Sequence, residues 1–167
     1  MWSSWPRRSA RSGQRVCPRL RRSGKSGGTS DVVVDASVWV SALVPSDVHH
    51  AASRRWLEAR LREGMPLVAP VILLAEVGGA IARRTGDTRL GRQAIDMLLA
   101  FPTLRLTPID DNLGGEAALL AARLRLRGVD AVYVATAVLV GAPLVTWDVE
   151  QRKRAVSVIQ AHAPDAP

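Results

Sequence analysis

Short apolar runs alternate with longer segments of helical periodicity from residue 31 onward. The runs have the length and the Val and Leu content of buried strands. Strands that alternate with helices indicate an α/β fold, here a three-layer α/β/α sandwich around a mainly parallel sheet. The predicted strands are 31–34, 66–70, 104–109 and 143–147, with 156–161 as the candidate for a last one.

Turn and cap residues set the predicted helix limits. Ser46 or Asp47 is expected to cap the second helix, Pro70 to begin the third, and Gly128 to end the fifth. Val48 is expected on the buried stripe of the second helix. The predicted helices are 36–44, 46–64, 70–84, 90–101, 110–128, 130–141 and 149–155.

Composition divides the chain into one domain and two appendages. Eight of the 23 basic residues and none of the 15 acidic ones lie in residues 1–30, so the formal net charge of +8 describes this extension. We expect 1–30 to be disordered, 31–160 to form the domain, and 161–167 to be a tail. The extension is open to three interpretations: an RNA-binding arm, a transit peptide, or an upstream segment without function.

Location and membrane contact follow from the same composition. Cys17, the one cysteine, lies in the extension, so an intrachain disulfide and a cysteine zinc site are excluded. The extension lacks the apolar core of a secretory signal, and we expect a cytoplasmic protein. Residues 65–82 and 128–146 are apolar, but each contains an acid and an interrupting Pro or Gly, so no membrane span is expected.

Four carboxylates stand alone in apolar surroundings. Asp35 and Asp148 follow predicted strands, and the carboxyl ends of parallel strands share one edge of a sheet. Asp130 opens a predicted helix, and helix capping alone explains any one of these three aspartates, with Gln151 placed as a capping-box partner of Asp148. Glu76 lies inside a predicted helix, beyond its first turn, where no cap explains it.

If the four acids meet, their like charges need a counter-charge. Carboxylate ligands suit Mg²⁺ or Mn²⁺, and the lack of nearby His or Cys argues against zinc. Such ions activate water and stabilise charge on a phosphoryl group. The predicted chemistry is metal-dependent hydrolysis of phosphodiesters.

The pieces VVVDASVWV, PVILLAEVGGAIARRTGD, LRLRGVDAVYVATA and APLVTWD occur in this order. With them the chain from residue 31 to about 160 resembles the PIN-domain ribonucleases, specifically the VapC toxins of type II toxin–antitoxin pairs. The resemblance implies an endoribonuclease whose acidic quartet holds one or two Mg²⁺ or Mn²⁺ ions, with a metal-activated water attacking the phosphorus. The residues it assigns are the quartet Asp35, Glu76 (directly or through water), Asp130 and Asp148, and the supporting hydroxyls Ser37 and Thr146.

The resemblance also implies an RNA substrate, a homodimer and a VapB-like antitoxin whose C-terminal segment covers the site. The candidate RNA contacts are basic residues, although such residues on outer helix faces are mostly only solvated. Core packing is expected for the tryptophans, and exposure for His49 and His50, either of which is a weaker RNA candidate. The basic candidates are Arg54, Arg55, Arg83, Arg84, Arg152, Lys153 and Arg154, and the tryptophans are Trp39, Trp56 and Trp147.

Two departures from the toxin pattern keep other functions open. Gln151 stands where an apolar residue is common, and the basic extension has no counterpart in the compact toxins. The alternatives are a catalytically inactive PIN-like module that binds RNA or protein, and a PIN nuclease of RNA processing outside a toxin pair.

Overall fold

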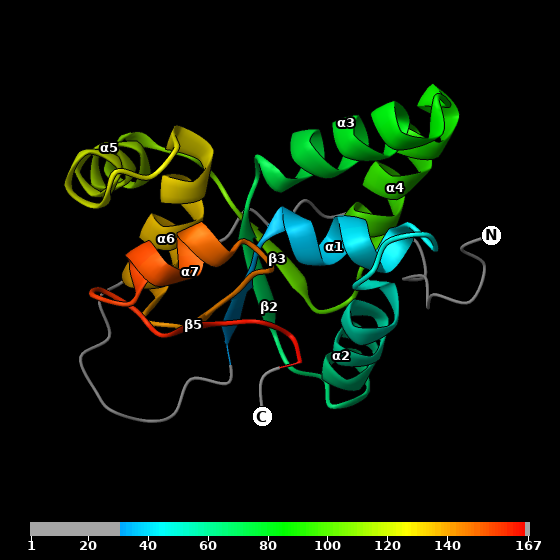
Figure 1. Cartoon of the computed structure of the whole chain (residues 1–167), viewed down its shortest axis with the longest axis horizontal. Coiled ribbons are helices and arrows are strands. Elements are labelled where there is room, and N and C mark those ends of the chain that lie inside the picture. Colours follow the sequence, from blue (N-terminus) through cyan, green and yellow to red (C-terminus); the bar gives the residue numbers. More distant parts are fainter. Residues whose placement is uncertain (1–30, 166–167) are drawn as a thin grey trace.

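The computed structural model describes residues 31–165 and places a five-stranded sheet between two layers of helices (Figure 1). The strand order is β3-β2-β1-β4-β5, and every neighbouring pair is parallel. The predicted α/β/α sandwich is confirmed. The strands are β1 (Val32–Val34), β2 (Leu67–Pro70), β3 (Leu104–Thr107), β4 (Leu144–Val145) and β5 (Ala161–His162).

The direction of each crossover decides which face a helix covers. From β1 to β3 the chain moves one way across the sheet, and from β3 to β5 it moves back. Because parallel crossovers are right-handed, α1 to α4 cover one face and α5 to α7 the other (Figure 1). The helices are α1 (Ala36–Leu43), α2 (His50–Arg62), α3 (Leu73–Thr85), α4 (Thr88–Ala100), α5 (Asp111–Leu124), α6 (Gly128–Val140) and α7 (Val149–Ala155).

The core forms around the central strands. All three valines of β1 are buried, as are both residues of β4. Trp39 of α1 is fully buried and meets Phe101 edge to face, with ring centroids 5.0 Å apart. Its predicted place in the core is confirmed.

The sheet has a switch point between β1 and β4. These strands are neighbours, with Val34 opposite Val145. The chain leaves β1 into α1 on one face and leaves β4 into α7 on the other (Figure 1). Ligands of open α/β sheets bind in the crevice that such a divergence opens at the carboxyl ends of the strands. The residues just after β1 and β4 are therefore the first place to look for a site.

Two helix starts and one burial in the first half differ from the predicted ones. Neither Ser46 nor Asp47 caps α2, because the chain first turns, with the Asp47 amide bonded to the Val44 carbonyl at 3.0 Å, and α2 begins at His50. Val48 falls in this turn and is 91% exposed, so its predicted burial is wrong. Pro70 ends β2 instead of opening α3, since it pairs with Thr107 of β3.

The other differences lie in the second half. Gly128 does not end α5; it is the first residue of α6. Helix α5 ends at Leu124, and its C-cap is Arg125, whose φ of 54° is left-handed. The sheet continues past residue 160, because β5 pairs with β4. No helix in residues 31–165 is long and apolar enough to cross a membrane.

Candidate active site

Asp35 lies at the switch point, directly after β1. It is only 8% exposed, and its Oδ2 accepts a hydrogen bond of 2.8 Å from the Ser37 amide at the start of α1. Burial raises the pKa of this carboxyl, and hydrogen bonds from the Ser37, Thr146 and Gln151 side chains lower it only in part. Asp35 is thus a helix cap, as predicted, and also a carboxylate whose charge is costly.

Glu76 approaches from α3 and is held by a tyrosine. It lies in the first turn of α3, because the helix begins at Leu73, so its predicted position beyond the first turn is wrong. The hydroxyl of Tyr133, a residue of α6, donates to Glu76 Oε2 at 2.7 Å. Burial raises the pKa of Glu76, the Tyr133 hydrogen bond lowers it, and the Asp35 and Asp130 charges raise it.

Tyr133 itself is fully buried. Burial raises the pKa of its hydroxyl far above the ordinary value, and the neighbouring Asp35 and Glu76 charges add to the shift. The hydroxyl therefore stays protonated and remains a donor at any physiological pH. This role was not predicted, because Tyr133 stands in an apolar helix where packing is the simplest explanation.

Asp130 belongs to the same group. It lies in the first turn of α6, but the N-cap is Arg127, so capping does not explain it. Burial raises the pKa of Asp130, the Asp148 and Asp35 charges raise it further, and the Arg127 charge lowers it. Asp148 caps α7, with its Oδ1 accepting from the Gln151 amide at 2.9 Å, as predicted. Charge coupling thus links all four acids.

Two hydroxyls join the turns that carry Asp35 and Asp148. Ser37 Oγ and Thr146 Oγ1 lie 3.3 Å apart. Ser37 Oγ accepts from the Trp147 amide, and Thr146 Oγ1 accepts from the Asp148 amide, both at 3.0 Å. Both predicted supporting residues therefore lie at the carboxyl edge, where they fix the backbone next to the acids.

Gln151 contacts the acids from α7. It is 1% exposed, and besides its amide bond to Asp148 its Nε2 donates to the Asp130 carbonyl at 3.2 Å. Its Oε1 is buried without a hydrogen-bond partner. The signal that pointed to this residue was a polar side chain at a usually apolar position.

The basic candidates for RNA contact are mostly engaged within the protein. Arg84 pairs with Asp47 at 2.7 Å, Arg54 with Glu58 at 3.0 Å, and Arg152 donates to the Thr146 carbonyl at 2.6 Å. Lys153 and Arg154 both face Glu150 on α7, while Arg55 and Arg83 are exposed on α2 and α3. Their contact with RNA stays a prediction.

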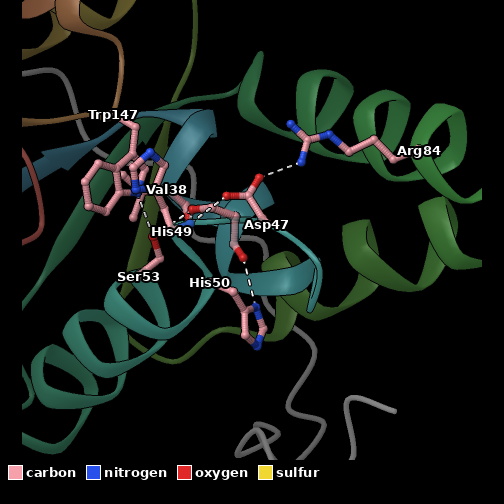
Figure 2. Close-up of polar contacts among 8 residues, drawn as sticks. Val38, Asp47, His49, His50, Ser53, Arg84 and Trp147 are labelled. Carbon is pink, nitrogen blue, oxygen red and sulfur yellow. Dashed lines mark hydrogen bonds and ion pairs between the residues drawn. The ribbon is translucent and has the colours of Figure 1, made fainter.

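Aromatic and imidazole rings lie beside this edge. Trp147 is partly buried against the core, and His49 stacks on it with ring centroids 3.8 Å apart (Figure 2). His49 and His50 are half-buried, so the expected exposure holds only in part. Trp56 is also partly buried, beneath the Arg60 guanidinium.

The donor set fits a hard divalent cation. Oxygen ligands are what Mg²⁺ and Mn²⁺ prefer. Burial is the largest cause of the raised pKa values of Asp35, Glu76 and Asp130. The positive charge of a bound cation would lower these pKa values. Within residues 31–165 no three His, Cys, Asp or Glu side chains already stand in the arrangement of a metal site.

Comparisons with known proteins agree with the fold. One similar structure is the VapBC2 complex of Rickettsia felis bound to promoter DNA, with 16% identity over 80% of this chain and 98% of that chain and a TM-score of 0.62. A second is the sarcin-ricin loop cleaving toxin VapC20 of Mycobacterium tuberculosis, with 20% identity over 73% of this chain and 93% of that chain and a TM-score of 0.64. A third is FitAcB of Neisseria gonorrhoeae, with 18% identity over 80% of this chain and 97% of that chain and a TM-score of 0.62. No curated protein sequence matches the chain at a significant level. The model of the PIN domain family matches residues 32–156. The chain therefore belongs to the PIN domain family.

Proposed function

We propose that this protein is a Mg²⁺- or Mn²⁺-dependent endoribonuclease and the toxin of a type II toxin–antitoxin pair. The observation that carries the proposal is the set of four coupled carboxylates at the switch point of the sheet, each at the N-terminus of a helix. Carboxylates in such a crevice form a cation site, and a hard cation there suits phosphodiester hydrolysis.

Each acid has a role in this proposal. Asp35, Asp130 and Asp148 would hold the metal, and Glu76 would act directly or through water. The ion, when bound, supplies activation of water and neutralisation of the charge that develops on the phosphoryl group. Tyr133, through its 2.7 Å hydrogen bond, keeps the Glu76 carboxylate aimed at the crevice.

RNA as substrate and a protein inhibitor as partner are supported by the neighbours in fold. One of them is described as a toxin that cleaves the sarcin-ricin loop, and another as a toxin–antitoxin complex from Klebsiella pneumoniae, 17% identical with a TM-score of 0.58. For this chain we therefore propose an RNA substrate, a VapB-like antitoxin as partner, and assembly as a homodimer.

Cleavage of RNA by the purified protein tests the enzymatic part. We expect cleavage with Mg²⁺ or Mn²⁺, loss with EDTA, and a loss of at least about a hundredfold in Asp35→Asn, because that change removes a ligand charge without changing shape. Asp96→Asn is the matched control, since Asp96 is exposed on α4. Cleavage that survives both EDTA and Asp35→Asn contradicts the proposal and favours an inactive binding module with a contaminating nuclease.

Expression in a host tests the toxin part. The chain alone should arrest growth, and co-expression of a small gene next to its own should relieve the arrest. Asp35→Asn should not arrest growth. An active nuclease that leaves growth unchanged would instead be a PIN nuclease outside a toxin pair.

A further inference from the structure

A chain of buried hydrogen bonds runs from Trp147 into α1. The indole Nε1 of Trp147 donates to Ser53 Oγ at 2.7 Å (Figure 2). Ser53 Oγ in turn lies 2.7 Å from Ser41 Oγ. Ser41 Oγ donates to the Val38 carbonyl at 3.0 Å, so its proton is already used. Ser53 must therefore donate to Ser41, and the chain has one direction, from the indole through two hydroxyls to the backbone of α1.

Each hydroxyl in this chain is buried and satisfied. Ser53 is 0% and Ser41 2% exposed. A buried donor without an acceptor is costly, so the indole N–H of Trp147 depends on Ser53 Oγ for its partner. A fully satisfied buried network of this kind favours one arrangement of its members over all others.

The other side of Trp147 is closed by His49. The imidazole lies almost parallel to the indole, at an interplanar angle of 11°. The turn before α2 holds His49 in place, because Asp47 Oδ1 accepts from the His49 amide at 3.0 Å and Asp47 also pairs with Arg84 of α3 (Figure 2). The start of α2 is thus packed against the turn that follows β4.

This packing acts on the residue before a proposed metal ligand. Trp147 stands between Thr146 and Asp148, and its own amide donates to Ser37 Oγ at 3.0 Å. Its backbone and its ring are therefore both attached to α1 or α2, while Asp148 begins α7 on the other face of the sheet. Because β4 has only two residues, the place of this turn depends on contacts beyond the strand, and the packing of Trp147 adds to those of Thr146.

We propose that Trp147 is a positioning residue that sets where Asp148 stands relative to Asp35. His49 stacks on its ring, and Ser53, itself bonded to Ser41, accepts its indole hydrogen bond. We name Trp147, His49, Ser53 and Ser41 the Trp147 clamp. The inference rests on the proposed function, because it assigns the clamp a role in forming the proposed metal site. Side chains that orient metal ligands typically change metal affinity by about 10- to 100-fold when they are removed.

The test compares Trp147→Phe, Ser53→Ala and the double variant with the wild-type full chain. Trp56→Phe is the matched control, because Trp56 is a partly buried tryptophan of α2 outside the clamp. Two quantities are measured in each: Mn²⁺ affinity by calorimetry, and hydrogen exchange of the peptide that covers residues 144–152. The exchange measurement needs neither metal nor RNA.

We expect faster exchange in 144–152 and Mn²⁺ affinity about tenfold weaker in both single variants, with wild-type values in Trp56→Phe. The double variant should lose little more Mn²⁺ affinity than either single one, because both single changes remove the same Trp147–Ser53 hydrogen bond. Unchanged exchange, or faster exchange with unchanged Mn²⁺ affinity, overturns the positioning role. A wild-type protein that binds no Mn²⁺ contradicts the proposed function instead, and the exchange result still decides whether the clamp holds the turn.

Discussion

The acids at the carboxyl edge make local contacts that stabilise them, but their charges are costly when they lie buried together. Asp35 and Asp148 cap helices, and Glu76 accepts from Tyr133. Yet the pKa values of Asp35, Glu76 and Asp130 are all raised, chiefly by burial. The metal-free protein therefore carries an electrostatic strain that depends on pH.

That strain predicts how stability changes with pH. The folded protein binds these protons more tightly than the unfolded chain, so the stabilisation is complete below the ordinary carboxyl pKa of about 4 and is lost as pH rises through the raised values. With EDTA, we expect the Tm to fall from about pH 5 to pH 8. Mn²⁺ should restore it at the higher pH, and Asp35→Asn should flatten the dependence.

The pKa of Asp47 is shifted in the opposite direction, but this does not affect the comparison of stability at pH 5 and pH 8. Arg84 beside Asp47 lowers the pKa of that carboxyl despite partial desolvation, so its contribution is lost only as pH falls below about 4. A metal-free protein equally stable at pH 5 and pH 8 would show that the acids are not strained.

The Tyr133→Phe variant tests the hydrogen bond to Glu76. Removing the hydroxyl leaves a half-buried carboxylate without its donor, and we expect a loss of about 1–3 kcal/mol in the free energy of unfolding by urea at pH 7. In a Glu76→Gln background the same change should cost less, since the charge is absent. Equal costs in both backgrounds would mean that the effect is packing alone.

The four acids were predictable at this scale because a lone charge in an apolar run stands out in the sequence. Tyr133 was not, since its partner Glu76 lies 57 positions earlier and only the fold brings the two together. The same holds for Trp147 and Ser53, which are 94 positions apart. Contacts of this range depend on which strands become neighbours.

At the scale of elements, the α3–α4 pair shows how small residues set a packing distance. A Cβ at Gly91 of α4 would lie 2.6 Å from the carbonyl oxygen of Gly78 on α3. The obstacle is backbone, so it cannot move aside as a side chain would. Strands and helices were predicted nearly in full from periodicity, whereas this close approach has no signal beyond the two glycines.

Gly91→Ala should therefore destabilise the protein. Alanine favours helices more than glycine does, but the clash forces the helices apart, and we expect a net loss of about 1–3 kcal/mol in the free energy of unfolding. Gly114→Ala in α5 is the matched control, because a Cβ there meets nothing within 4 Å, and it should be neutral or stabilising by up to about 1 kcal/mol. Equal effects of the two changes would contradict the close packing of α3 on α4.

At the scale of the whole molecule, the reversal of chain direction between β1 and β4 creates the site. The strand order sends α1 and α7 to opposite faces (Figure 1), and the turns that carry Asp35 and Asp148 are joined by hydrogen bonds where the faces part. The shared edge for Asp35 and Asp148 was predictable from parallel strands alone. The way α3 and α6 bring Glu76 and Asp130 to it was not, because the lengths of the crossovers do not specify where their helices begin.

Calorimetric titration of Mn²⁺ into the full chain tests the central claim most directly, that the four carboxylates form a cation site. The wild-type protein and Asp96→Asn should bind Mn²⁺ alike, and Asp35→Asn should bind at least about tenfold more weakly, because the site loses a charged ligand. Binding that is absent in the wild type, or unchanged in Asp35→Asn, would contradict the account.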